Sequence, residues 1–222
     1  MKAKTTTIIG VTGLIGSYLY ELLKPDKNFE TVRLIVRRLM AKDDDHTEIK
    51  LVDFNDAESL LLAIDGSDVV FCTVGTTNKK VKGDKEAYRK VDYDIPVKAA
   101  RFCKLTGCET FVLVSAVGAN SKSNNFYLQL KGEVEAAIKE IGLKSVHIMR
   151  PSMLLGDRKE FRPGEKIGKG IMKVFSPLFA GGIRKYRPIH SGDVAKAMIA
   201  AAKENKEGFF VYEYKEMKEL IS

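Results

Sequence analysis

The sequence predicts an α/β fold in which helices cover both faces of a doubly wound parallel sheet. Two observations predict it. Short runs of β-branched and apolar residues alternate with longer segments of helical period, a pattern typical of β-α-β units with parallel strands. The 222 residues also suffice for one domain with a substantial core. We therefore expect one domain over residues 1–222, in which the less regular part, 151–222, contributes a small cap.

The individual elements follow from these runs in chain order. The predicted strands are residues 5–10, 31–36, 48–54, 68–74, 109–116, 144–150 and 208–214. The predicted helices are residues 14–24, 57–64, 85–105, 126–141 and 191–203, followed by a terminal helical turn. Pro25 ends the first helix, Pro96 should kink the long third helix or mark a bend in it, and Ser191 is the expected N-cap of the last.

Composition predicts the general class and the compartment. The chain is 45% apolar and 30% charged, and no apolar run approaches the ~20 residues needed to span a bilayer. The first residues lack the apolar stretch and cleavage site of a signal peptide. The cysteines, Cys72, Cys103 and Cys108, have no metal-ligand spacing. These features favour a reduced, cytosolic protein without a metal site.

The net charge of +8 is concentrated in one segment. Residues 158–187 hold nine basic and two acidic side chains, and the rest of the chain is nearly neutral. Within it, residues 165–179 combine an apolar side with lysines that share a face. We hypothesise a cap over an apolar pocket with a cationic rim, or a weak contact with an anionic membrane; a plain solvated helix is the alternative. Without interleaved aromatic residues, nucleic-acid binding is not expected.

The first predicted strand runs into a glycine-rich turn that opens the first helix. Residues 10–16 follow the pattern GxxGxxG. Glycine lets the backbone turn sharply and lets a pyrophosphate approach the amides, and the helix N-terminus stabilises its negative charge. We predict dinucleotide binding here; a glycine-rich turn without a ligand is the alternative. The expected contacts are Gly10, Thr12, Gly13, Leu14, Ile15 and Gly16.

The end of the second predicted strand favours NADP(H) over NAD(H). In NAD-binding versions of such a turn, an acid about 20 residues beyond the glycines binds the ribose 2′-hydroxyl. Here Arg37 and Arg38 stand at that place, and the next acid is Asp43. Guanidinium groups bind a 2′-phosphate through charge-assisted hydrogen bonds. NADP(H) is therefore the preferred cofactor and NAD(H) the alternative, unless both arginines are only solvated surface residues.

Two later strand ends carry candidate contacts for the adenosine. Asp53 could accept a hydrogen bond from the adenine amino group while Phe54 packs on the ring, or Asp53 could simply cap the next helix. Thr73, Val74 and Gly75 end the fourth strand, where Gly75 lets the backbone pass close to the ribose. An ordinary strand-to-helix turn is the alternative for these three residues.

Ser115, Tyr127 and Lys131 stand at the end of the fifth predicted strand and in the helix that follows it. Ser115 ends the fifth predicted strand, and Lys131 follows Tyr127 by one helical turn beside the apolar face of its helix. A free tyrosine has a pKa of ~10, and a cation one turn away in a partly dehydrated cleft favours the ionised form. The alternative is a lysine that extends along the protein surface to solvent.

Together these motifs resemble the short-chain dehydrogenase/reductase superfamily. The glycine turn, Ser115 and Tyr127-x-x-x-Lys131 carry the resemblance. The stretches FCTVGTT, SNNFYLQ, KGEVEA and RPGE, and Arg150-Pro151 followed by paired leucines, look like its atypical branch, specifically the Tat-interacting oxidoreductase-like proteins. The resemblance covers nearly the whole chain.

The resemblance implies an NAD(P)-binding Rossmann-like fold with a small C-terminal substrate cap. It also implies roles for the catalytic group: Tyr127 exchanges a proton with the substrate oxygen, Lys131 also binds the nicotinamide ribose, and Ser115 hydrogen-bonds the substrate oxygen. Related enzymes often have an asparagine in the helix before the fifth strand. This chain has Asp92 there, so the resemblance does not imply a proton relay through that position.

The resemblance also places the nicotinamide against Pro151, Ser152 and Leu154. We interpret His190, just before a helix, as structural. The expected function is an NADP(H)-dependent oxidoreductase acting on a carbonyl or alcohol substrate, with an anionic or lipid-like compound as a candidate. A cofactor-binding regulator that controls partner binding with little turnover is the alternative. A nucleotide-sugar epimerase or dehydratase is less favoured, because this chain is far shorter than the epimerases that share its glycine spacing.

Overall fold

The computed structural model describes residues 4–40, 44–156 and 181–222. The segment 165–179, for which a basic cap or membrane contact is hypothesised, lies outside the described residues, as do Asp43 and most of the basic segment 158–187.

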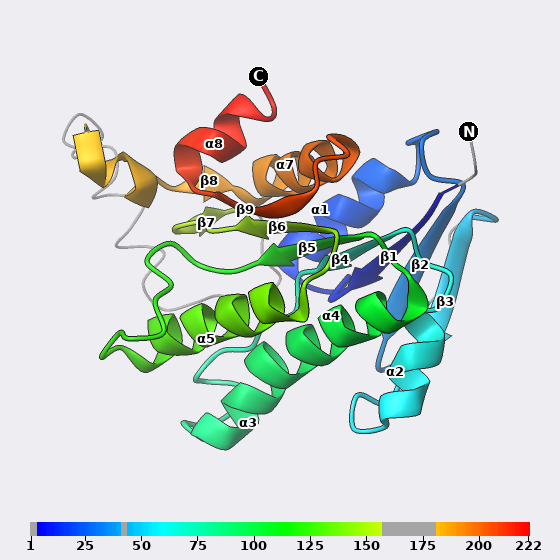
Figure 1. The fold of residues 1–222 in the computed structure, drawn as a ribbon, viewed down its shortest axis with the longest axis horizontal. Coiled ribbons are helices and arrows are strands. Elements are labelled where there is room, and N and C mark those ends of the chain that lie inside the picture. The colour runs from blue at the N-terminus through cyan, green and yellow to red at the C-terminus, as the bar shows by residue number, and fades with distance from the viewer. Residues whose placement is uncertain (1–3, 41–43, 157–180) are drawn as a thin grey trace.

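A seven-stranded sheet forms the centre of the molecule (Figure 1). Its strands are β1 (Thr5–Ile9), β2 (Thr31–Val36), β3 (Thr47–Leu51), β4 (Val69–Cys72), β5 (Thr110–Val114), β6 (Ser145–Met149) and β9 (Gly208–Tyr212). The spatial order is β3-β2-β1-β4-β5-β6-β9, and every neighbouring pair is parallel. The chain builds outward from β1 to β3 and then returns to add β4 on the other side of β1. The predicted doubly wound parallel sheet is confirmed.

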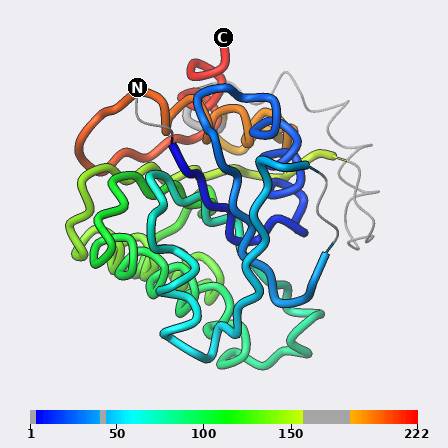
Figure 2. The backbone as a smooth tube through the Cα atoms, turned by 90° about the vertical axis from the view of Figure 1, so that its right-hand side faces the viewer, coloured from blue at the N-terminus to red at the C-terminus, as the bar shows by residue number. Residues whose placement is uncertain are grey.

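Helices cover both faces of this sheet (Figure 1). One face carries α1 (Leu14–Leu23), α7 (Ser191–Lys203) and α8 (Tyr214–Glu219). The other carries α2 (Ala57–Ile64), α4 (Ile95–Thr106) and α5 (Phe126–Ile141), with α3 (Lys85–Arg89) leading towards α4. Helices α1 and α7 pack against each other although they come from opposite ends of the chain, as the blue and orange segments of Figure 2 show.

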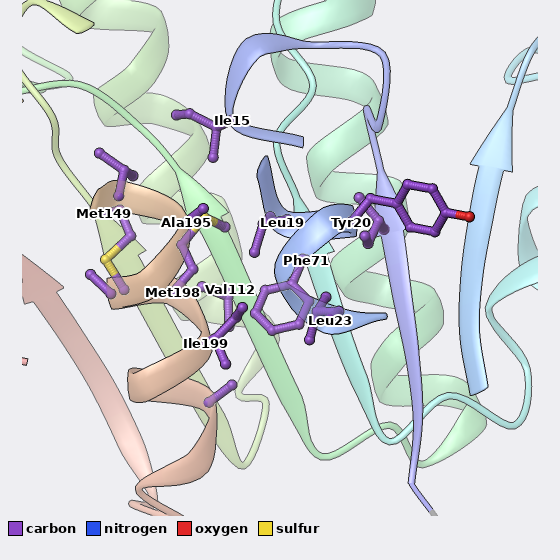
Figure 3. Close-up of a cluster of buried hydrophobic side chains, with 14 of the residues drawn as sticks. Ile15, Leu19, Tyr20, Leu23, Phe71, Val112, Met149, Ala195, Met198 and Ile199 are labelled. Atoms are coloured by element: carbon purple, nitrogen blue, oxygen red, sulfur yellow. The ribbon is translucent and has the colours of Figure 1, made fainter. Parts of the chain in front are cut away.

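The core lies in two layers, one on each side of the sheet. The layer beneath α1 and α7 contains Leu19 and Met198, both fully buried (Figure 3). Strand β4 contributes to both layers: Phe71 points into this one, and Cys72 points into the layer beneath α2, α4 and α5. Strands buried on both faces are continuous apolar runs, which is why this part of the sequence lacks the alternation of a half-exposed strand.

The predicted long helix over residues 85–105 is continuous but not uniform. Between α3 and α4 it contains one π-helical turn, η1 (Lys90–Asp94). Pro96 lies in the first turn of α4, where it has no N–H to donate and its ring would clash with the carbonyl group four residues earlier in a regular α-helix. The kink expected at Pro96 therefore takes the form of a wide turn. This turn holds Asp92 in the interior, 1% exposed.

The chain after β6 forms a second, two-stranded parallel sheet from β7 (Leu154–Leu155) and β8 (Ile189–His190), with a 3₁₀ helix η3 (Gly181–Tyr186) before β8. The prediction that Ser191 caps α7 is wrong. The Nδ1 atom of His190 accepts the hydrogen bond from the Gly192 N–H at 3.1 Å, and the buried Ser191 hydroxyl donates to the Leu155 carbonyl instead. His190 thus has the structural role expected for it.

Candidate active site

The glycine turn between β1 and α1, residues 10–16, has a tight backbone path that only glycine permits, and we call it the glycine cradle. Gly10 has a φ of +97°, and a Cβ there would lie 2.9 Å from Thr73. A Cβ on Gly16 would lie 2.2 Å from the Gly10 carbonyl oxygen, closer than any real contact. The Thr73 hydroxyl donates to the carbonyls of Ile9 and Gly10, at 3.2 and 3.1 Å. The side chain of Thr73 therefore fastens this turn to the end of β4.

The N-terminus of α1 opens onto this cradle. Gly13 is the N-cap and provides no side-chain hydrogen bond, so the N–H groups of the first turn have no partner within the helix. Such a terminus binds phosphate groups. Thr12 is exposed and Leu14 is half-buried, but the Ile15 side chain is buried in the core (Figure 3). Of Ile15, only the backbone N–H is thus available to a ligand.

A cavity of about 640 Å³ lies at the ends of β2 and β3. Its lining residues are Arg37, Leu51, Val52, Asp53, Phe54, Asn55, Lys90, Val91, Asp94, Ile95 and Lys98. Three predicted residues, Arg37, Asp53 and Phe54, are therefore brought together, whereas Arg38 is exposed and outside the lining. Three further lining residues were not predicted, namely Lys90, Asp94 and Lys98, although their spacing of four residues on one predicted helix was a usable signal.

Asp53 does not cap the helix that follows it. Its Oδ1 atom accepts hydrogen bonds from the backbone N–H and the side-chain amide of Asn55, both at 2.9 Å. The N-cap of α2 is Asp56, which accepts from the Glu58 N–H. Strand β3 ends at Leu51 rather than at residue 54, so Asp53 and Phe54 lie in the turn that borders the cavity.

The two other residues predicted at the end of β4 lie between the glycine turn and η1. Val74 packs against the core layer beneath α4 and α5. A Cβ on Gly75 would lie 3.5 Å from Oδ1 of Asp92. This turn therefore lies against the helix that carries Asp92, at a distance where a small side chain would also fit.

Tyr127 and Lys131 lie on successive turns of α5, as predicted. The helix begins with Asn125 as N-cap, whose side chain accepts from the Leu128 N–H at 3.2 Å. Tyr127 is 38% exposed, and the Lys131 Nζ lies 5.9 Å from the centre of its ring. Lys131 is only 5% exposed, so its side chain does not extend to solvent.

The Lys131 ammonium is held by a buried carboxylate. Its Nζ lies 2.9 Å from Oδ1 of Asp92, and the other Asp92 oxygen accepts the Thr76 N–H at 2.7 Å. Burial lowers the pKa of Lys131, but the charge of Asp92, together with Tyr127 and the hydrogen bond to Asp92, outweighs burial and raises the pKa above its ordinary value. Lys131 is therefore a cation at neutral pH, fixed next to Tyr127.

Ser115 belongs to a second buried network. Its hydroxyl donates to Oε1 of Glu135 at 2.5 Å, and Arg150 donates to both oxygens of the same carboxylate, at 3.0 and 2.5 Å. The hydrogen bond to Glu135, opposed by burial, raises the pKa of Arg150. Ser115 is 4% exposed, and its single hydroxyl proton points to Glu135. Neither Glu135 nor Arg150 was predicted, although Glu135 lies one turn after Lys131.

The segment predicted to contact the nicotinamide lies beside the glycine turn. Pro151 is buried, and its carbonyl accepts the Val117 N–H at 3.0 Å. The Ser152 hydroxyl donates to the Arg187 carbonyl, and Leu154 begins β7. Slightly further along, a Cβ on Gly156 would lie 3.4 Å from a methyl group of Leu14. The contact between Gly156 and Leu14 brings the chain after β7 against the start of α1.

The three cysteines are buried and form no disulfide bonds, and burial raises the pKa of the Cys72 thiol to about 12. In residues 4–40, 44–156 and 181–222, no three carboxylate, imidazole or thiol groups are arranged to bind a metal ion. None of the helices within these ranges is both long and apolar enough to cross a bilayer.

The parallel sheet, the glycine cradle and the cavity beyond β2 and β3 together define an NAD(P)-binding protein with a Rossmann-like fold. The residues present fit such a cofactor, because the N–H groups in the first turn of α1 have no partner within the helix and no side chain caps them. The sequence model of a family described as NAD(P)H-binding matches residues 10–205, and the chain belongs to this family.

Curated relatives agree with the resemblance inferred from the motifs. Protein HTATIP2 of Rattus norvegicus is 35% identical over 185 residues, covering 82% of this chain and 76% of the relative. Protein FMP52, mitochondrial, of Candida glabrata is 36% identical over 210 residues, covering 93% and 88%. The resemblance to Tat-interacting oxidoreductase-like proteins is confirmed. The expected cytosolic location is contradicted, because several fungal relatives are named as mitochondrial proteins.

Solved structures share the fold. UDP-N-acetylglucosamine 4-epimerase from Methanobrevibacter ruminantium superposes with a TM-score of 0.71 at 21% identity, covering 96% of this chain and 77% of that one. The Bordetella bronchiseptica enzyme WbmH, solved in complex with NAD⁺, gives 0.71 at 18%, covering 96% and 75%. At these identities the likeness concerns the fold alone.

Proposed function

We propose that this protein is an NADP(H)-dependent oxidoreductase that interconverts a carbonyl compound and an alcohol, with Tyr127 as the acid–base residue. The observation that carries the proposal is the pairing of a partly exposed phenol with a buried, positively charged lysine one turn away. The family membership supports the cofactor class. The preference for the phosphorylated form is supported by Arg37 and Arg38, since neither bonds to a described residue and no acid stands in their place.

A bound nicotinamide would supply or accept the hydride. Tyr127 donates its proton to the carbonyl oxygen in the reductive direction and removes a proton from the alcohol in the other. Lys131 stabilises the phenolate that forms and, with one of its three N–H groups on Asp92, has two more for a ribose hydroxyl and the phenol. The Ser115 hydroxyl donates to Glu135 in this structure, and it binds the substrate oxygen by turning this O–H from Glu135 to that oxygen.

The test is a panel of carbonyl compounds, including anionic and lipid-like members, assayed by NADPH oxidation. Tyr127→Phe should lower turnover by ~10²–10⁴-fold and leave NADPH affinity unchanged. Tyr214→Phe, at the first residue of α8, which lies on the opposite face of the sheet from α5 (Figure 1), is the matched control and should retain full activity. A substrate reduced at the full rate by Tyr127→Phe would contradict the mechanism.

One observation supports a second candidate function, a cofactor-binding regulator with little turnover. Two of the three catalytic candidates already have charged partners within the protein: Ser115 donates to Glu135 and Lys131 pairs with Asp92. In this alternative, NADPH binds wild type and Tyr127→Phe equally, and neither reduces any member of the panel. Turnover by wild type that depends on Tyr127 would reject the regulator.

A further inference from the structure

We infer that Lys98 and Lys90, acting with Arg37, form the subsite that distinguishes the phosphorylated from the unphosphorylated cofactor by binding the 2′-phosphate of its adenosine. The inference rests on the proposed NADP(H) function and deepens it. It assigns part of the cofactor choice to the helix after β4, whereas the sequence pattern assigned it to the turn after β2 alone.

Two chain segments form facing walls of the cavity. The turns after β2 and β3 contribute Arg37 and residues 51–55, and the π-turn with the start of α4 contributes the other wall. On that helix Lys90, Asp94 and Lys98 recur at every fourth position, and all three line the cavity. Residues four apart share one helix face, so this face turns both lysines towards the turn that carries Arg37.

The positively charged side chains that line the cavity are not neutralised by its carboxylates. Three cations, Arg37, Lys90 and Lys98, meet two carboxylates, and the Asp53 carboxylate already accepts two hydrogen bonds from Asn55. Within the described part of the chain, none of the three cations has an ion-pair or hydrogen-bond partner. Neighbouring Arg89, by contrast, pairs with Glu133 at 2.7 Å. Like charges gathered without partners in a concave site favour an anionic ligand.

The rest of the lining suits an adenosine. Val52, Phe54 and Ile95 provide apolar surface for a base, and the volume of about 640 Å³ falls within the range of small-molecule sites. The cavity also lies beyond the carboxyl ends of β2 and β3, where open α/β sheets bind ligands. A base on the apolar surface would place the ribose, and any phosphate on it, beside the cationic groups.

The experiment compares calorimetric affinities for NADPH and NADH, and for adenosine 2′,5′-bisphosphate and adenosine 5′-monophosphate. Lys98→Met retains the aliphatic stem and removes the charge. We expect it to weaken NADPH and the bisphosphate about tenfold or more, since a charge-assisted hydrogen bond is lost, and to change NADH and the monophosphate less than about twofold. Lys90→Met should act in the same direction.

Arg101→Met is the matched control. It removes one positive charge from the exposed side of the same helix, outside the cavity lining, and should leave all four affinities unchanged. If wild type binds NADPH no better than NADH, the proposed cofactor preference and this inference both fall. If wild type prefers NADPH but both lysine variants keep the full preference, only the subsite is overturned. An equal loss in Arg101→Met would show a general charge effect and would also overturn it.

Discussion

At the scale of single residues, Asp92 keeps the candidate catalytic lysine, Lys131, protonated. A lysine buried as deeply as Lys131 would lose its proton far more readily without a compensating charge, and Asp92 supplies that charge at 2.9 Å. The sequence placed Lys131 correctly beside the apolar face of its helix. It did not reveal its partner, because Asp92 lies 39 positions earlier in the chain and reaches Lys131 only through the packing of η1 against α5.

Asp92→Ala should destabilise the protein by about 3–5 kcal/mol, because it leaves a buried ammonium group without its partner. Asp94→Ala removes the same group from the same π-turn but has no ion pair with Lys131, and its effect should stay below about 1 kcal/mol. Urea unfolding of both variants at pH 7 measures the difference. Equal stabilities would mean that the buried pair contributes nothing to the folded state.

His147 makes the stability of the fold depend on pH. Burial lowers its pKa to about 4, and its ring nitrogens lie 2.9 Å from the hydroxyls of Ser145 and Tyr212. The unfolded chain binds a proton at an ordinary pKa of ~6.5, above the pH at which the folded protein binds one. The contribution of His147 to the unfolding free energy is therefore fully present above pH ~6.5. It is lost as the pH falls from there towards 4, by up to about 1.4 kcal/mol per pH unit.

Unfolding free energies at pH 7.5, 6 and 5 test this dependence, with His147→Phe as the variant that lacks the titrating group. The wild-type curve should fall more steeply than that of His147→Phe over this range. His46→Gln, at an exposed position, should follow the wild type. Parallel curves for wild type and His147→Phe would contradict the assignment.

At the scale of elements, hydrophobic periodicity predicted the bounds of the regular helices well, whereas β3, β4 and β5 end two or three residues before their predicted ends. The helices over residues 57–64 and 126–141 begin and end at the predicted positions. The π-turn was not predictable in the same way, because the spacing of a π-turn differs from that of an α-turn by one residue. Its place is fixed by Pro96 together with the pairing of Asp92 across to α5, and only the second of these requires tertiary structure.

At Gly132 we expect the usual preference of helices for alanine over glycine to be reversed. In an exposed helix, alanine in place of glycine stabilises by ~1 kcal/mol. A Cβ on Gly132, however, would lie 2.2 Å from the Ser121 backbone nitrogen, where the loop after β5 packs on α5. We therefore expect Gly132→Ala to destabilise by about 1–3 kcal/mol, as overpacking does. Thermal or urea unfolding decides the sign, and a stabilised variant would show that the loop yields freely.

At the scale of the whole molecule, the cofactor should stabilise the fold by mass action. A ligand present at 100 times its dissociation constant adds about 2.7 kcal/mol to the unfolding free energy, which corresponds to a rise in Tm of roughly 5–10 °C for a chain of this size. At equal concentrations NADPH should raise Tm more than NADH. In Arg37→Met, the rises in Tm caused by NADPH and by NADH should become similar. If NADPH raises the Tm of Arg37→Met as much as that of the wild type, Arg37 does not contribute to cofactor binding.

The site as a whole was predictable where its residues are close in sequence. The glycine turn and the Tyr127–Lys131 spacing are local patterns, and the structure shows both as expected. The network of Ser115, Glu135 and Arg150 was not predicted, because it joins the ends of β5 and β6 to α5. Which strands are neighbours depends on the order of the sheet, and local periodicity carries no information on that order.

The hydrogen bonds from the Thr73 hydroxyl to the glycine turn have a consequence for the way the protein folds. Strand β1 reaches β4 only by closing a long loop, as the register of Thr6 with Val69 shows. Pairings of such sequence separation are slow to form, so refolding should take milliseconds to seconds and not microseconds. Helix α1 can form earlier, but its cradle is incomplete until Thr73 arrives. In a stopped-flow experiment, the capacity to bind cofactor should therefore appear with the slow phase, after most helical signal has returned.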